Sequence, residues 1–152
     1  MQIDKKTITI ELIQPDEYQQ WLPLWQSYQQ FYQVTLSELT TKITWQRFFD
    51  TNEPVYCAVA KIGNELIGFT HFVFHRSTWA EKNFCYLEDL FVVPNIRGKQ
   101  VGKQLIDYVK RQALDQQCAR LYWHTQETNS TAQKLYDWVA EKPGVIEYRM
   151  AL

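Results

Sequence analysis

The sequence predicts an α/β domain with a mixed, mostly antiparallel sheet of about six to seven strands and helices on both faces. Two observations lead to this fold class. Three β-rich runs follow one another at residues 55–62, 65–76 and 84–93, which indicates an antiparallel meander. A helical stretch and a further β-rich run come next, and such a strand–helix–strand connection joins parallel neighbours. The 152 residues contain no repeat or linker, so we expect a single domain over residues 1–152.

The first third of the chain predicts one strand and two helices. Residues 7–13 alternate polar and apolar side chains, as a half-buried strand does. Pro15 and two acidic residues then open a helix, whose stripe of aromatic side chains continues to residue 32. Pro23 lies inside this pattern, where proline breaks or kinks a helix. A second helix is expected over residues 41–50.

The remainder continues this alternation. Gly63 and Asn64 separate the first two strands of the meander and suit a tight hairpin turn. The other expected elements are a helix over 98–118, a strand over 120–126, a helix over 129–140 and a closing strand over 145–152.

Charge and hydropathy restrict the class of protein. The formal net charge of −1 argues against a general nucleic-acid binder, which needs an excess of basic side chains. No apolar run approaches the roughly 18 residues that a membrane span requires, and residues 1–10 lack the apolar core of a signal peptide. We therefore expect a cytoplasmic protein that binds neither nucleic acid nor membrane.

Cysteine and histidine positions give no sign of a metal site. Three cysteines lie far apart among apolar neighbours and are expected to be reduced core residues: Cys57, Cys85 and Cys118. His71 and His75 would stand roughly 13 Å apart along one strand, too far to share a metal ion. We expect structural roles for both and for His124.

The stretch 86–106 carries the strongest functional signal. An apolar, β-branched run stops at Pro94, and a loop with basic residues and glycines leads into an amphipathic helix. The start of a helix presents unpaired N–H groups and the positive end of the macrodipole. This stretch therefore predicts a phosphate-binding site.

The loop also resembles a known motif. The run from Arg97 to Gly102 resembles the Gln/Arg-x-x-Gly-x-Gly/Ala motif that binds acetyl-CoA in the GNAT superfamily of N-acetyltransferases, with Gln100 at the first glycine position. The order of elements matches that fold along nearly the whole chain, and Asn129 and Tyr136 resemble the second conserved pair of the family. The run Leu-Glu-Asp-Leu-Phe-Val at 87–92 is most similar to the spermidine/spermine (diamine) acetyltransferase branch.

The resemblance implies acetyl-CoA as cosubstrate and assigns residues to it. The loop and helix start would bind its pyrophosphate, through Arg97, Gly98, Lys99, Gln100, Val101, Gly102 and Lys103. A bulged strand end would offer backbone amides to the pantetheine arm and the thioester oxygen, from Leu90, Phe91, Val92 and Val93. Asn129 would touch the cofactor arm, and Tyr136 would donate a proton to its sulfur. From the pattern alone, Asn129 is a helix N-cap and Tyr136 a core tyrosine.

Glu88 and Asp89 are the candidates on the acceptor side. A free alkylamine has a pKa near about 10.4 and needs a base at neutral pH. We expect Glu88 to fill that role, directly or through water, and Asp89 to attract the ammonium. Neighbours on a regular strand point to opposite faces, so only one should face the thioester unless the strand is bulged. The alternative is that both are solvated or in ion pairs.

The aromatic helix of residues 15–32 completes the predicted acceptor site. Its side chains are mostly core packing by their spacing. The resemblance places this region over the acceptor pocket, where Tyr28 and Tyr32 would contact a cationic amine.

These expectations combine into one predicted reaction. The chain is predicted to transfer an acetyl group to a primary amine of a small molecule, such as a polyamine, amino acid or aminoglycoside, by direct attack in a ternary complex. Two alternatives stay open: a protein N-terminal or lysine acetyltransferase, and a non-catalytic acyl-CoA-binding module, which Gln100 brings into consideration. The resemblance also suggests a homodimer, with the strand at 145–152 as an exchange point.

Overall fold

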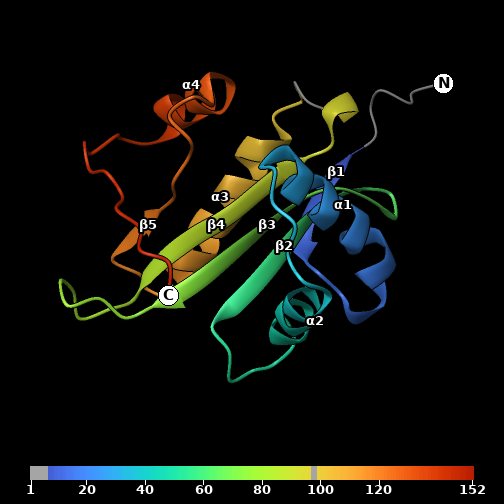
Figure 1. Ribbon diagram of the computed structural model, residues 1–152, viewed down its shortest axis with the longest axis horizontal. Coiled ribbons are helices and arrows are strands. Elements are labelled where there is room, and N and C mark those ends of the chain that lie inside the picture. The colour runs from blue at the N-terminus through green and yellow to red at the C-terminus, as the bar shows by residue number, and fades with distance from the viewer. Residues whose placement is uncertain (1–6, 97–98) are drawn as a thin grey trace.

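The computed structural model describes residues 7–96 and 99–152, and its sheet runs in the order β1-β2-β3-β4-β5 (Figure 1). The strands are β1 (Ile8–Leu12), β2 (Val55–Ile62), β3 (Glu65–His75), β4 (Phe84–Val92) and β5 (Arg120–Tyr122). The helices are α1 (Tyr18–Phe31), α2 (Glu38–Arg47), α3 (Val101–Asp115) and α4 (Ser130–Val139), with short 3-10 turns at Pro15–Glu17 and Pro94–Ile96. The predicted α/β class is confirmed.

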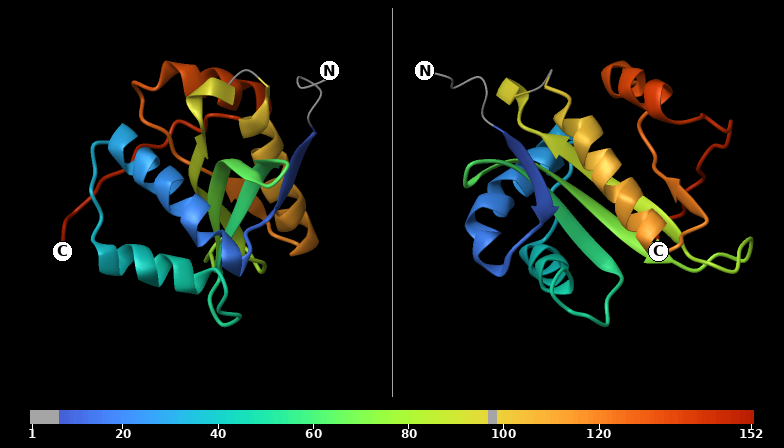
Figure 2. Two further views of the ribbon diagram at one scale, coloured as in Figure 1. Left: turned by 90° about the vertical axis from the view of Figure 1, so that its right-hand side faces the viewer. Right: turned by 180° about the vertical axis from the view of Figure 1, so that it is seen from behind.

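Helices cover both faces of the sheet, as predicted (Figure 2). On one face Trp21 and Trp25 of α1 pack against Phe69 of β3, and α2 joins them through partly buried aromatic side chains. On the other face Ile106 of α3 packs against Phe72 of β3, and α4 covers the same cluster. Each face of β3 therefore meets its own core, because successive side chains of a strand point to opposite faces.

The meander and the parallel crossover are both present. Strands β1 to β4 pair antiparallel with their neighbours, and β5 pairs parallel with β4. The parallel pairing covers three residues of β4 and ends at Tyr86↔Tyr122. Beyond this point the described residues of the two strands diverge, so a wedge opens toward their carboxyl ends, which is where ligands bind in open α/β sheets.

A β-bulge interrupts the pairing of β3 with β4. His71 lies opposite Asp89 and Phe72 lies opposite Leu87, so Glu88 is the extra residue on β4. A bulge of this kind leaves one residue outside the ladder and turns neighbouring side chains away from strict alternation. The carboxylate pair singled out in the sequence sits at this irregularity.

The described sheet has five strands rather than six or seven. Residues 145–152, predicted as a closing strand, form no strand and are highly exposed, including Tyr148 at 90%. Alternating β-formers do not make a strand without a hydrogen-bonding neighbour, and β5, at the sheet edge, offers only Arg120–Tyr122. β5 itself stops short of residue 126 because it leaves β4 after Tyr122.

The helices in the first third differ from prediction at single positions. α1 continues through Pro23 without ending, and Trp21 and Trp25 hold both halves of it against the sheet. α2 begins at Glu38, three residues before the expected start, because the Ser37 side chain accepts a hydrogen bond from the Thr40 amide and caps the helix. None of the described helices combines the length and the hydropathy needed to cross a bilayer.

Candidate active site

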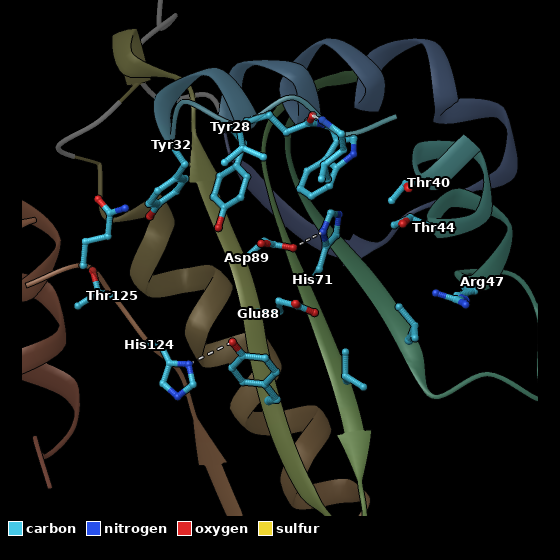
Figure 3. A pocket seen from close by; sticks show the side chains of 18 of the residues that line it. Tyr28, Tyr32, Thr40, Thr44, Arg47, His71, Glu88, Asp89, His124 and Thr125 are labelled. Carbon is cyan, nitrogen blue, oxygen red and sulfur yellow. Dashed lines mark hydrogen bonds and ion pairs between the residues drawn. The ribbon is translucent and has the colours of Figure 1, made fainter. Parts of the chain in front are cut away.

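A pocket of about 750 Å³ lies beside the bulge (Figure 3). Its walls come from α1, α2, the middle of β3 and β4, the segment after β5 and the C-terminal segment. Both Glu88 and Asp89 line it. The bulge is the exception that the sequence analysis allowed, and at it both side chains line the same pocket.

The two carboxylates have different surroundings. The Glu88 side chain is exposed to the pocket, whereas that of Asp89 is only 15% exposed. Although the side chain is exposed, the surrounding pocket walls partly desolvate its carboxyl group, which raises the pKa of Glu88 above its ordinary value. The negative charge of Asp89 raises this pKa further. A carboxylate with a raised pKa is a stronger base, so Glu88 suits proton transfer.

Asp89 is held by a buried hydrogen-bond series. His71 Nδ1 lies 2.8 Å from Asp89 Oδ2, and the Trp21 indole N–H donates to His71 Nε2 at 3.1 Å. His71 is 3% exposed and lines the pocket (Figure 3). Sequence patterns do not predict this contact, since it depends on the register between two strands.

The other two histidines differ from His71. His124 also lines the pocket, and its Nδ1 lies 3.2 Å from the Tyr86 hydroxyl. His75 lies outside the pocket lining and bonds Tyr122 at 2.7 Å. Among the residues that the structure describes, no group of His, Cys, Asp and Glu could hold a metal ion.

Tyr28 of α1 and Tyr32, the residue that follows this helix, line the pocket above the carboxylates (Figure 3). Burial raises the pKa of the Tyr28 hydroxyl well above its ordinary range, and the charge of Asp89 and a hydrogen bond to it act in the same direction. Tyr32 hydrogen-bonds with the side chains of Asn129 and Tyr28. The tyrosines thus connect this pocket with the start of α4.

The start of α3 fits a phosphate group. The described residues place no side-chain cap on this helix, so its first amides have no side-chain acceptor. Gln100, at the first glycine position of the motif, has φ 60 and ψ 28, the left-handed conformation that glycine adopts easily. Lys99 is exposed, while Lys103 forms an ion pair with Asp107 at 2.8 Å. Arg97 and Gly98 lie outside the described residues.

The end of β4 offers amides in alternation. The Val93 amide donates to the Ile67 carbonyl of β3 at 2.9 Å, so this amide is engaged within the sheet. Successive amides of a strand point to opposite sides. That of Leu90 therefore points toward the wedge, and that of Phe91 points toward β3.

Asn129 and Tyr136 meet the same wedge from α4. The Asn129 side chain accepts a hydrogen bond from the Ala132 amide at 3.2 Å, so it is the N-cap of the helix. Tyr136 is half-buried and packs edge-on against Trp123. Burial, and then the neighbouring Tyr32, raise the pKa of Tyr136 to about 12, so its hydroxyl carries its proton at neutral pH.

The sequence reasoning missed three charged residues of the pocket. Arg47 reaches it from α2, while Glu147 and Arg149 reach it from the C-terminal segment, where they bond to each other at 2.7 Å. Their positions depend on contacts far apart in the chain. The sequence pattern at residues 145–152 is an alternation of polar and apolar side chains, which predicts a strand and not a pocket wall.

Comparison with known proteins places this architecture in context. The model of the family described as Acetyltransferase (GNAT) family matches residues 18–138. The D-amino-acid N-acetyltransferase HPA3 of Saccharomyces cerevisiae is 31% identical over 144 residues, which are 93% of this chain and 89% of that protein. The thialysine N-epsilon-acetyltransferase of Mus musculus is 30% identical over 114 residues, and this chain spans 66% of that protein. The aminoglycoside N-acetyltransferase AAC(6')-Iy in complex with CoA has a TM-score of 0.81 at 20% identity, with 96% of each chain covered, which shows the common fold.

Proposed function

Because the chain belongs to the acetyltransferase (GNAT) family and is an acyltransferase that uses acetyl-CoA, we propose that it acetylates a primary amine of a small molecule. The acceptor is a polyamine, an amino acid or an aminoglycoside-like amine. The amine attacks the thioester directly while both substrates are bound. The relatives named above, which act on D-amino acids, thialysine and aminoglycosides by their names, support this class of acceptor.

The observation that carries the proposal is the pocket beside the bulge. Its volume of about 750 Å³ falls within the range of small-molecule sites, which is roughly 300–1,000 Å³. Two carboxylates from consecutive residues, Glu88 and Asp89, face it together with the rings of Tyr28 and Tyr32. Negative charge beside aromatic rings suits a cationic amine.

Glu88 is the proposed base. The acceptor reaches the pocket as an ammonium, and Glu88 accepts its proton directly or through a water molecule. The freed nitrogen lone pair then attacks the thioester carbon, so an N–C bond forms and the C–S bond breaks. The second proton of the nitrogen leaves at this step and replaces the proton that Tyr136 gives to the sulfur. The raised pKa of Glu88 brings the two groups closer in proton affinity.

The wedge between β4 and β5 would hold the thioester and its leaving group. The Leu90 amide, which points into the wedge, is the proposed donor to the carbonyl oxygen, where negative charge develops. Tyr136 is the proposed acid, since its hydroxyl keeps its proton at neutral pH and can pass it to the departing sulfur. Asn129 would contact the cofactor arm from the start of the same helix.

The start of α3 is the proposed pyrophosphate site. Amides from Gln100 to Lys103 lie at the positive end of the helix dipole. Gln100 has a left-handed backbone conformation, which glycine adopts easily, so the residue type differs from the motif at a position that glycine would also tolerate. Arg97, Gly98 and Lys99 keep their predicted role in this proposal.

An amine-library assay with acetyl-CoA that measures free thiol tests the proposed function. We expect thiol release with one or more small cationic amines. The Tyr136→Phe variant should still bind acetyl-CoA in calorimetry and should lose most turnover. Absence of release with every small amine would contradict the small-molecule proposal, and absence of binding heat at millimolar acetyl-CoA would favour neither enzyme nor binding module.

We also propose that the protein is a homodimer that pairs through residues 145–152. This segment alternates apolar and polar side chains yet forms no strand in the single chain, and its apolar members are exposed. A second copy would supply the missing ladder partner and cover those side chains. Since Glu147 and Arg149 line the acceptor pocket, pairing there would also fix part of the pocket wall.

A further inference from the structure

The series Trp21–His71–Asp89 is the most completely determined polar arrangement near the pocket. An indole N–H can only donate, so the contact at 3.1 Å requires His71 Nε2 to be an unprotonated acceptor. The proton of a neutral imidazole must then be on Nδ1, which faces Asp89 Oδ2 at 2.8 Å. Protonation of Nε2 would place two N–H donors against each other inside the core.

The neutral form of His71 has an electrostatic consequence. A Lys, an Arg or an imidazolium at this position would pair with Asp89 and cancel its charge. The two side chains that hydrogen-bond to Asp89, His71 and Tyr28, are instead both uncharged donors. They fix the orientation of the carboxylate and leave its negative charge for a cation in the pocket.

The other neighbours of His71 support this view. Glu88 lies beside Asp89 on β4, the Cys57 thiol lies opposite His71 in the register with β2, and α1 contributes Tyr28. Phe48 packs on the ring from α2, and Trp25 and Phe69 surround it. A charged ring would therefore have one hydrogen-bonded anion on one edge and a donor on the other, within an aromatic shell.

We propose that Asp89, oriented by a neutral His71 whose tautomer Trp21 determines, is the residue that binds the ammonium group of the acceptor. His71 and Trp21 are positioning residues in this proposal, and Glu88 remains the base. The inference rests on the proposed function, because it assigns the anchor for the amine that this function requires. It adds to the expected roles of the two carboxylates, base and anchor, the two residues that orient the anchor.

Steady-state kinetics with a cationic acceptor test the positioning role. His71→Leu removes the donor to Asp89 and should raise the KM for the amine about tenfold, since a hydrogen bond to a charged group contributes about 1.5–3 kcal/mol. The KM for acetyl-CoA should not change. His71→Asn places an amide N–H near the Nδ1 position and should restore most of the amine affinity. His71→Leu combined with Asp89→Asn should be no worse than Asp89→Asn alone, because both act through one carboxylate.

The Trp21→Phe variant tests the tautomer. It removes the indole N–H and keeps an aromatic ring, so His71 Nε2 becomes free to take a proton. The amine KM of this variant should exceed that of the wild type, because a second proton on His71 would cancel the charge of Asp89. Nitrogen-15 NMR should show His71 neutral and protonated on Nδ1 in the wild type.

His75→Asn is the matched control, because His75 lies on the same strand outside the pocket lining. Its amine KM should equal that of the wild type. A wild-type His71 protonated on Nε2, or an unchanged amine KM in a folded His71→Leu variant, would overturn the inference. If His71→Leu does not fold, the Trp21→Phe kinetics and the NMR result decide. Loss of all transfer in the wild type would instead count against the proposed function, and the NMR measurement needs no turnover.

Discussion

At the scale of single residues, Gln100 has a left-handed backbone conformation that glycine adopts more easily than any other residue. The family motif has glycine at this position, and Gln100 adopts φ 60 there. A non-glycine residue in the left-handed region costs about 1–2 kcal/mol. The loop before α3 therefore keeps this conformation at a cost in stability.

Gln100→Gly should therefore stabilise the protein by about 0.5–1 kcal/mol, because relief of the backbone strain exceeds the entropy that glycine adds to the unfolded chain. Urea unfolding measures this change, and calorimetry with acetyl-CoA should show no loss of affinity. Gln117→Gly, at the other end of α3 with φ 58, is the matched control. It should give a similar gain in stability with no change at the cofactor site. A destabilised Gln100→Gly variant would show that the side chain contributes more than its backbone strain costs.

At the scale of elements, the close approach of β3 and β4 shapes the cofactor side. A Cβ atom on Gly68 would lie 2.7 Å from the Phe91 carbonyl oxygen, a backbone atom that cannot move aside cheaply. Gly68 pairs with Val92, directly before the Val93 amide that bonds to Ile67. This glycine therefore fixes the position of the strand end at the wedge.

Gly68→Ala should destabilise the protein by about 1–3 kcal/mol through overpacking and should weaken acetyl-CoA binding, because the end of β4 must shift. Thermal unfolding and calorimetry measure the two effects. Gly63→Ala provides the contrast: its added Cβ meets nothing within 4 Å, but φ is +62, so we expect a loss of stability with unchanged cofactor affinity. Equal cofactor affinity in both variants would contradict the role given to Gly68.

The sequence predicts those elements that depend on neighbours in the chain. The meander, the crossover to β5 and the two amphipathic helices follow from local periodicity and tight turns, and all are present. The prediction of a strand over 145–152 was wrong, because an alternation of side chains indicates only strand propensity and does not supply a hydrogen-bonding partner.

The site shows the same division. One pocket is lined by four residues that the sequence analysis selected: Tyr28, Tyr32, Glu88 and Asp89. The bond between His71 and Asp89 was not predicted from the sequence. The connection over residues 76–83 is too long to fix the register of β3 with β4. The bulge that places Glu88 beside Asp89, and the pairing of His71 with Asp89, could therefore not be derived.

At the scale of the whole molecule, the exposed C-terminal segment lines the pocket and is also the proposed dimer interface. Sedimentation of the full chain at micromolar concentration should give a dimer, and a chain that lacks residues 144–152 should give a monomer. The reason is that a strand with exposed apolar side chains gains stability from a second copy. Trp79→Ser, which removes an exposed apolar ring on the β3–β4 connection, is the control and should stay dimeric. A monomeric full chain, or a dimeric truncated chain, would contradict the proposal.

The pocket walls come from widely separated parts of the chain. They come from α1 and α2 near the beginning, from β3 and β4 in the middle and from Glu147 and Arg149 near the end. The bulge on β4 supplies the two carboxylates of the middle wall. Substitutions in α1, α2 or the C-terminal segment can therefore reshape the outer walls of the pocket and leave these carboxylates in place.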